Sequence, residues 1–257
     1  MSYKIAVIGG SGFLGSHVAD LLTESGHSVK IFDQKISPWL KQNQEMIIGD
    51  IFDTNCIQKA VSGCEYVFHF AGLSDLNQNL HRPIDSVKIN ILGTVKLLDE
   101  CRKAGVERFI FASSMYVYSR EGSFYRCSKQ AAESYIEEFH KSYGLNYTIL
   151  RFGSLYGPRS DEKNGLYRII KNAIKDGIVS YEGSSETIRE YVHVFDMAQA
   201  CKEVLGNHFK NQNLILTGTE STKVYDLLHT IAEIIGLPNS AVKFTETDYE
   251  GHYIRTP

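Results

Sequence analysis

Short apolar runs alternate with longer segments of helical period through the first 150 residues of the chain. The runs predict buried strands at residues 5–8, 29–32, 45–48, 66–70, 109–112 and 147–150. Between them, apolar residues recur every three or four positions and predict helices over residues 13–25, 84–104 and 125–143. This alternation indicates a parallel sheet covered on both faces by right-handed crossover helices.

The alternation loosens after Arg151. Loops, short strands and helices follow, and we place the helices at residues 163–175, 196–206 and 224–235. We therefore expect an α/β fold of two parts. Residues 1–150 form a Rossmann-like, doubly wound parallel sheet, and residues 151–257 form a smaller C-terminal α/β lobe interleaved with it.

Composition narrows the class of protein. Hydrophobic residues make up 43% and charged residues 22% of the chain, as in an ordinary globular protein. The net charge of −3 and the isoelectric point of about 6.3 argue against general nucleic-acid binding. The apolar runs are too short to cross a bilayer, and we see no signal-peptide pattern. Five cysteines without a Cys-x-x-Cys pair favour reduced thiols, a cytoplasmic location and no metal site.

A glycine-rich loop joins the first strand to the first helix. Gly9, Gly12 and Gly15 allow the backbone to come close to a pyrophosphate at the helix N-terminus, where Phe13 and Leu14 begin the helix. Such a loop alone is weak support, because a plain glycine turn looks the same. Here a strand precedes it and a helix follows, as a dinucleotide site requires.

Acidic residues follow the second and third strands. Asp33 ends the second strand, where a carboxylate can bind the ribose hydroxyls of an adenosine and repel a 2′-phosphate, so NAD is favoured over NADP. Asp50 and Ile51 follow the third strand, and Asp50 either hydrogen-bonds the adenine or has a structural role only. Asp53 is expected to cap the next helix. We therefore assign NAD binding to residues 1–150.

A tyrosine and a lysine lie one helical turn apart after the fifth strand. Their spacing places Tyr125 and Lys129 on one helix face, where an ammonium lowers the pKa of a neighbouring phenol. Such a tyrosine can exchange a proton with a substrate hydroxyl as a hydride moves to or from nicotinamide. Ser114, at the end of the fifth strand, can hydrogen-bond the same oxygen. We predict Ser114, Tyr125 and Lys129 as the catalytic residues.

These motifs together resemble the extended short-chain dehydrogenase/reductase family, in its nucleotide-sugar epimerase and dehydratase branch, over nearly the whole chain. The matching motifs are the G-x-x-G-x-x-G loop at Gly9–Gly15, Phe70-Ala71-Gly72, Asn90-Ile91-Leu92-Gly93-Thr94, Ser114-Met115-Tyr116-Val117-Tyr118, Tyr125 with Lys129, Leu150–Arg159 and Arg189–Asp196. The resemblance implies that Phe70, Ala71, Gly72 and Asn90 contact NAD, and that Tyr125 and Lys129 do so too.

The resemblance also implies a nucleotide-diphosphate sugar as the substrate. Ser154, Arg159 and Arg189 match positions that bind it in the second lobe, with Arg189 on the diphosphate. A guanidinium suits that bidentate contact. The alternative for Arg189 is a surface arginine on an edge strand.

The chain departs from the family pattern at three places. Ten residues separate Ser114 from Tyr125, fewer than in relatives, so the substrate pocket is expected to be more open or differently built. Ser154 stands where relatives usually have an asparagine. The chain ends at Arg255-Thr256-Pro257, before the last arginine and helix that relatives often have, and Arg255 is the candidate substitute.

Three activities remain open on these residues. Met115-Tyr116 stands where 4,6-dehydratases of the family carry an Asp-Glu pair, which argues against dehydration. The first hypothesis is an NAD-dependent nucleotide-sugar epimerase that acts at C4 through a keto-sugar, with Tyr125 as acid/base. A reductase or dehydrogenase of a sugar nucleotide or another carbonyl substrate, using NAD or NADP, is the alternative. A non-catalytic NAD-binding regulator is a third, although both Tyr125 and Lys129 are present.

We also expect a homodimer. The helix at residues 84–104 is apolar on nearly all sides, and Ala132, Tyr135, Ile136 and Phe139 form a stripe on the next helix. Members of the family often pair these two helices with their twins in a four-helix bundle. The alternative is that both faces are buried against the sheet.

Overall fold

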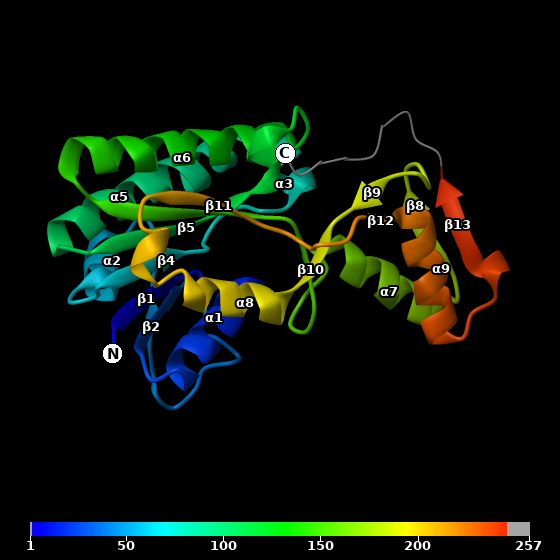
Figure 1. Ribbon diagram of the computed structural model, residues 1–257, viewed down its shortest axis with the longest axis horizontal. Helices are drawn as coiled ribbons and strands as arrows, with labels where there is room; N and C mark the ends of the chain where they lie inside the picture. The colour runs from blue at the N-terminus through cyan, green and yellow to red at the C-terminus, as the bar shows by residue number, and fades with distance from the viewer. Residues whose placement is uncertain (1, 246–257) are drawn as a thin grey trace. The chain divides into compact units, whose positions relative to one another are not determined.

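A parallel sheet forms the centre of the first part of the chain (Figure 1). The structure, a computed structural model, describes residues 2–245, with Asn77 by its backbone alone. Within this range the sheet has seven parallel strands in the order β11-β6-β5-β4-β1-β2-β3. Their bounds are β1 Lys4–Ile8, β2 Ser28–Asp33, β3 Gln44–Ile48, β4 Tyr66–His69, β5 Arg108–Ser114, β6 Asn146–Phe152 and β11 Gln212–Leu216. The predicted Rossmann-like sheet is confirmed.

Strand β11 is an addition to the predicted set. It pairs with β6 from Gln212 opposite Thr148 to Leu216 opposite Phe152. Its sequence begins with the exposed polar residues Gln212 and Asn213. An edge strand of this kind lacks the continuous apolar run by which the other strands were predicted.

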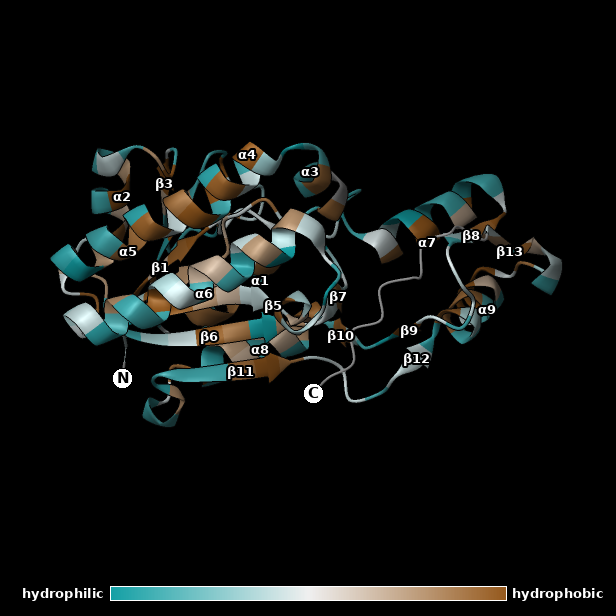
Figure 2. Ribbon diagram, turned by 90° about the horizontal axis from the view of Figure 1, so that it is seen from above, coloured by the Kyte–Doolittle hydropathy of each residue, from teal (hydrophilic) through white to brown (hydrophobic). Residues whose placement is uncertain are grey.

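Helices cover both faces of the sheet. Figure 1 shows α5 (Gly93–Ala104) and α6 (Ser123–Tyr143) along one face, and α1 (Phe13–Glu24) and α8 (Val194–Glu203) along the other. Both α5 and α6 alternate between hydrophilic and hydrophobic colours (Figure 2), as expected for helices with one buried side. That side packs on Phe109 and Phe111 of β5, which are fully buried. Nowhere in residues 2–245 does a helix combine the length and apolarity that a bilayer span requires.

The predicted helix at residues 84–104 is a composite. It begins with α4 (Pro83–Ser86), widens into a π-helical turn, η1 (Val87–Leu92), and continues as α5. A shorter helix, α3 (Leu76–His81), precedes it. Helix α2 (Thr54–Val61) begins as predicted at Asp53, whose carboxylate accepts hydrogen bonds from the backbone N–H groups of Asn55 and Cys56. Insertions such as η1 occur often at functional sites.

The chain divides into two compact units. Unit 1 contains residues 1–152 and 195–216, and unit 2 contains residues 153–194 and those from 217 onward. The helix expected at residues 196–206 in the smaller lobe is α8, and it belongs to unit 1. The reason is that the chain after α8 returns to the sheet and adds β11 beside β6.

Unit 2 has short strands around a separate core. The strand pairs are β7 (Ser154–Tyr156) with β10 (Tyr191–His193), β9 (Ile188–Arg189) with β12 (Thr222–Lys223), and β8 (Val179–Glu182) with β13 (Val242–Thr245). Helices α7 (Gly165–Asp176) and α9 (Val224–Ile235) lie close to their predicted positions. Leu166, Val179, Leu228 and Ile231 form the centre of the core of this unit.

Candidate functional site

The glycine loop after β1 is packed too closely for side chains. Gly9 has a φ of +82°, and a Cβ on it would lie 2.5 Å from the backbone nitrogen of Ala71. A Cβ on Gly15 would lie 2.4 Å from the carbonyl oxygen of Gly9. Only glycine fits either position. The loop therefore presents bare backbone at the edge of the sheet where β1 ends.

Helix α1 begins directly after this loop without a side-chain cap. Its N-cap is Gly12, in an extended conformation, and within the described residues no side chain caps it. Phe13, Leu14 and Gly15 form the first turn, whose N–H groups have no intrahelical acceptor. An open helix N-terminus beside a glycine cradle fits the pyrophosphate of a dinucleotide.

The two acidic candidates differ in what they contact. Asp33 ends β2, half-buried, and accepts a hydrogen bond of 3.0 Å from the backbone N–H of Ser11 in the glycine loop. Its place beside the loop fits a ribose contact. The exposed Asp50 accepts from the backbone N–H of Phe52 at 2.8 Å and from the Gln34 amide at 3.1 Å. These two bonds give Asp50 a structural role in its turn, whereas Ile51 is buried nearby.

The end of β4 approaches the same edge of the sheet. The backbone N–H groups of Phe70 and Ala71 donate to the carbonyl oxygen of Ile8 on β1, at 2.8 and 3.0 Å. A Cβ on Gly72 would lie 3.0 Å from the amide oxygen of Asn90. The segment is therefore held against the glycine loop on one side and against η1 on the other.

Asn90 lies on the π-helical turn and is almost fully buried. Its amide oxygen accepts from the backbone N–H of Leu73 at 2.7 Å. Its amide nitrogen donates to the Leu73 carbonyl at 3.0 Å and to the Ser128 hydroxyl at 2.9 Å. The predicted cofactor contact is thus also a link between the β4 loop and the start of α6.

The structure brings the three predicted catalytic residues together. Ser114 ends β5, and its hydroxyl is hydrogen-bonded to the phenol of the half-buried Tyr125 in the first turn of α6. The Lys129 ammonium lies 5.7 Å from the centroid of the Tyr125 ring and donates to the carbonyl oxygen of Ala112 at 2.7 Å. It also lies 4.6 Å from the centre of the Phe111 ring. The described residues contain no cluster that could bind a metal ion.

The protonation of this group differs from the prediction. Burial raises the pKa of Tyr125 to about 12, and the hydrogen bond with Ser114 opposes that rise. Burial lowers the pKa of Lys129 to about 8, and the Glu133 carboxylate opposes that fall. The expectation that Lys129 gives Tyr125 a lowered pKa is therefore wrong for this structure. Desolvation destabilises the phenolate by more than the neighbouring polar groups stabilise it.

The short segment between Ser114 and Tyr125 is folded tightly. Residues Met115–Tyr118 form a 3₁₀ turn, η2, and the Tyr116 ring meets the Tyr125 ring edge-on with centroids 6.2 Å apart. Gly122, with a φ of +90°, packs so closely on Tyr116 that a Cβ would lie 2.7 Å from its ring. The phenol of Tyr116 thus stands beside Tyr125, the predicted acid/base, at the position where 4,6-dehydratases are expected to carry a carboxylate.

The three predicted substrate residues belong to unit 2. Ser154 begins β7 and lies opposite Tyr191 of β10, and Arg189 ends the strand just before β10. Both are half-buried, and the Arg189 guanidinium donates to the Tyr181 hydroxyl at 3.3 Å. Arg159 follows β7 with a φ of +67°. Arg255 lies outside the described residues.

An ion pair lies beside the predicted catalytic group, and neither of its two residues was among those predicted from the sequence. Glu133, one turn after Lys129 on α6, pairs with Arg151 of β6 at 2.7 Å. Periodicity marks Glu133 only as a polar residue on a helix. Its spacing of four from Lys129 is the one signal in the sequence that places it near the site.

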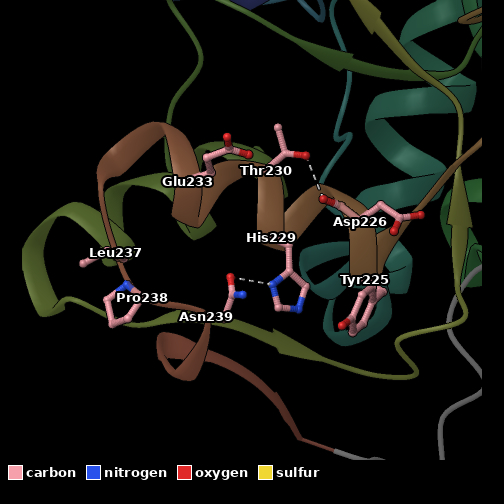
Figure 3. A pocket seen from close by; sticks show the side chains of 8 residues that line it. All are labelled: Tyr225, Asp226, His229, Thr230, Glu233, Leu237, Pro238 and Asn239. Carbon is pink, nitrogen blue, oxygen red and sulfur yellow. Dashed lines mark hydrogen bonds between the residues drawn. The ribbon is translucent and has the colours of Figure 1, made fainter.

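An open hollow lies on the surface of unit 2 (Figure 3). It has a volume of about 690 Å³ and includes Tyr225 and His229 of α9, whose rings lie 4.4 Å apart at their centroids. The His229 ring also pairs with the Asn239 amide at 3.4 Å. None of the predicted site residues lines this hollow.

The chain is similar in sequence and in fold to known sugar-nucleotide enzymes. The sequence profile of the "NAD dependent epimerase/dehydratase family" matches residues 5–216. A Methanocaldococcus jannaschii protein named "Putative UDP-glucose 4-epimerase" is 30% identical over 93% of this chain and 84% of its own length. The crystal structure of UDP-glucose 4-epimerase from Thermotoga maritima with UDP-glucose has a TM-score of 0.83 and 29% identity, over 96% of this chain and 90% of the other. UDP-N-acetylglucosamine 4-epimerase from Methanobrevibacter ruminantium has a TM-score of 0.88 and 26% identity, over 98% and 88%.

Proposed function

Because this chain belongs to the NAD dependent epimerase/dehydratase family, we propose that it interconverts UDP-sugars that differ in configuration at C4. NAD is the cofactor of this enzyme family. The observation that carries the proposal is the Ser114, Tyr125 and Lys129 group, in which a phenol is hydrogen-bonded to a hydroxyl beside an ammonium. The relatives that act on UDP-glucose and UDP-N-acetylglucosamine indicate the substrate class.

The chain's own residues account for the proton movements of such a reaction. NAD, held by the Gly9–Gly15 loop and Asp33, would supply the hydride acceptor and donor for C4. In its phenolate form Tyr125 takes the proton of the C4 hydroxyl and later gives it back, and Ser114 holds the same oxygen in place. The Lys129 ammonium supplies the positive charge that favours the phenolate during the transfer.

The chemistry beside Tyr125 favours epimerisation over dehydration. A 4,6-dehydratase needs a carboxylic acid to protonate the departing C6 hydroxyl. The side chains that follow Ser114 are Met115, which is buried, and Tyr116, whose ring packs on Gly122. Neither can serve as that acid.

The proposal is tested by turnover and by cofactor content together. We expect the purified protein to interconvert UDP-glucose and UDP-galactose, or the N-acetylated pair, without added reductant, followed by the anomeric proton signals in NMR. We expect Tyr125→Phe to retain its NAD and to lose about 10²- to 10⁴-fold in kcat. The matched control is Tyr135→Phe, on the exposed face of the same helix. Unchanged turnover in Tyr125→Phe would show that the acid/base is another residue.

The substrate contacts of this enzyme extend the proposal to unit 2. Ser154, Arg159 and Arg189 are assigned to the nucleotide-diphosphate part of the sugar nucleotide. The half-buried Arg189, held by the Tyr181 hydroxyl, supports a diphosphate contact, because a guanidinium held in place can bind two phosphate oxygens.

A homodimer is part of the same proposal. Large apolar side chains are exposed along the outer side of α3, α4 and η1, namely Leu80, Ile84, Val87 and Leu92. Tyr135 is exposed on α6, whereas Ala132 and Ile136 of the predicted stripe are buried in the core and Phe139 packs against it. The dimer face therefore consists of these five exposed residues, with a second copy of the chain as its partner.

We also propose a cytoplasmic location, which the free thiols support. All five cysteines are free, and Cys64, Cys101 and Cys201 are buried. Burial raises the pKa of each of these three thiols, which keeps them inert side chains of the core. A reducing compartment is the setting in which such a set persists.

A further inference from the structure

The Glu133 carboxylate is the buried centre of a polar network. It is 7% exposed, on the inner side of α6. The Arg151 guanidinium donates to both of its oxygens, at 2.7 and 3.1 Å. The Ser113 hydroxyl donates to it at 2.5 Å. Arg151 also donates to the Tyr118 hydroxyl and lies 4.9 Å from the centre of the Tyr118 ring.

This network joins the elements that carry the catalytic group. Ser113 is the neighbour of Ser114 in β5, and it lies opposite Arg151 in the pairing of β5 with β6. Tyr118 ends η2, the turn that begins directly after Ser114. Glu133 itself is one turn from Lys129 on α6. One carboxylate therefore ties the end of β5, the end of β6 and η2 to the helix of Tyr125 and Lys129.

The surroundings of Lys129 give the same carboxylate a second role. The hydrogen-bond acceptor of the ammonium is a neutral carbonyl, and the rings beside it are those of Phe111 and Tyr125. His69 of β4 is also near and remains neutral, because burial and then the charge of Lys129 lower its pKa to about 3. Among the groups that act on Lys129, Glu133 supplies the negative charge.

On this geometry, and resting on the function proposed above, we propose that Glu133 is a positioning residue that holds the catalytic ends of β5 and α6 together and keeps Lys129 an ammonium. A buried ion pair adds little stability on balance, because desolvation offsets its Coulomb attraction. Arg151 neutralises part of the Glu133 charge and fixes the orientation of the carboxylate through two parallel hydrogen bonds.

The test uses two variants that break the same ion pair. In Glu133→Gln the negative charge is lost, so Lys129 deprotonates more easily. The alkaline limb of the pH profile of kcat therefore moves to lower pH, by on the order of one unit. In Arg151→Met the Glu133 charge acts on Lys129 without compensation, so the limb moves to higher pH. A purely structural pair gives the two variants the same change. Shifts in the same direction, or no shift in either, therefore overturn the proposal.

Two further variants make the result unambiguous. Glu133→Asp keeps the charge, so its alkaline limb stays at the wild-type pH even where its kcat falls. Glu138→Gln, on the exposed side of α6, is the matched control and leaves the limb unchanged. Where Glu133→Gln does not fold, Arg151→Met decides alone, and a limb that stays or moves to lower pH overturns the proposal.

The affinity for NAD, measured by calorimetry over the same pH range, separates this proposal from the proposed reaction. Lys129 is assigned to the cofactor site, so affinity falls as it deprotonates. If UDP-sugars are not turned over but the pH profiles of NAD affinity shift in opposite directions in Glu133→Gln and Arg151→Met, the proposed reaction is rejected and the role of Glu133 is supported. If UDP-sugars are turned over but neither variant shifts its pH profile, only the proposed role of Glu133 is rejected.

Discussion

Lys129 is a charged group held inside the protein, 6% exposed. Its pKa of about 8 lies below the ordinary value of 10.5, because burial disfavours the ammonium. Between these two pH values the unfolded chain binds more protons than the folded one, so this residue makes stability rise with pH. Below pH 8 the whole cost of burying the charge is present, roughly 3 kcal/mol for a difference of this size.

We therefore expect Lys129→Met to gain stability relative to the wild type at pH 7 and to lose that advantage progressively as the pH approaches 10.5. Urea denaturation of both proteins, freed of NAD, at pH 7, 8, 9 and 10 measures the difference in unfolding free energy. Tyr125, whose pKa is raised from 10 to about 12, titrates above this range in the folded proteins, and only its unfolded form begins to titrate near pH 10, equally in both proteins. Lys141→Met, at an exposed position of the same helix, is the control. Parallel curves for wild type and Lys129→Met would contradict a buried ammonium.

That the three proposed catalytic residues lie together was predictable from the sequence, whereas the pKa of Tyr125 was not. Tyr125 and Lys129 are one turn apart on a helix, and Ser114 ends a strand, so local spacing is enough to bring them together. The pKa of Tyr125 depends on how completely the fold buries it, which a spacing of four does not contain. The Glu133 and Arg151 pair joins a helix to a strand, and neither residue differs from a surface charge in the sequence.

At the scale of elements, the turn from β1 to α1 depends on two separate demands at Gly9. The backbone needs a positive φ, and the close approach of Ala71 leaves no room for a Cβ. Gly26, in the turn from α1 to β2, has nearly the same φ, +85°, with nothing within 4 Å of a Cβ. A substitution at Gly26 therefore tests backbone strain alone, whereas one at Gly9 tests backbone strain together with steric exclusion.

We expect Gly26→Ala to cost about 1 kcal/mol, the strain of a left-handed conformation in a residue with a Cβ. Gly9→Ala carries the same strain and must also push β1 and β4 apart, so it costs several kcal/mol more and abolishes NAD binding. Chemical denaturation measures the first effect and calorimetric titration of NAD the second. Equal losses in the two variants would show that the loop yields to the methyl group.

Most of the elements could be predicted, and the exceptions share a cause. Strands β1 to β6 are apolar enough to be read from periodicity, and Asp53 marks the start of α2. The edge strand β11 begins with Gln212 and Asn213, so its place in the sheet is set by pairing with β6. The π-helical turn at Val87–Leu92 likewise lacks a pattern of its own, because the contacts of Asn90 with Leu73 and Ser128 define it.

At the scale of the whole molecule, exposed apolar surface is the feature that the single chain leaves unexplained. Ile84 is 78% exposed and Val87 54%, on helices that pack against α6 within unit 1. Side chains of this size gain by leaving water, about 25 cal/mol for each Å² that a partner covers. Ile234 on α9, in unit 2, is similarly exposed, at 79%, but it is not one of the five residues of the proposed dimer face.

We expect the protein to have the mass of a dimer at micromolar concentration and Ile84→Glu combined with Val87→Glu to have the mass of a monomer, because two buried charges on each side of a twofold interface oppose each other. Size-exclusion chromatography with light scattering gives both masses. Ile234→Glu is the matched control and remains dimeric, since it adds the same charge at an equally exposed isoleucine outside the face. A monomeric wild type would contradict the proposed homodimer. A double variant that remains dimeric would show that the interface does not include Ile84 and Val87.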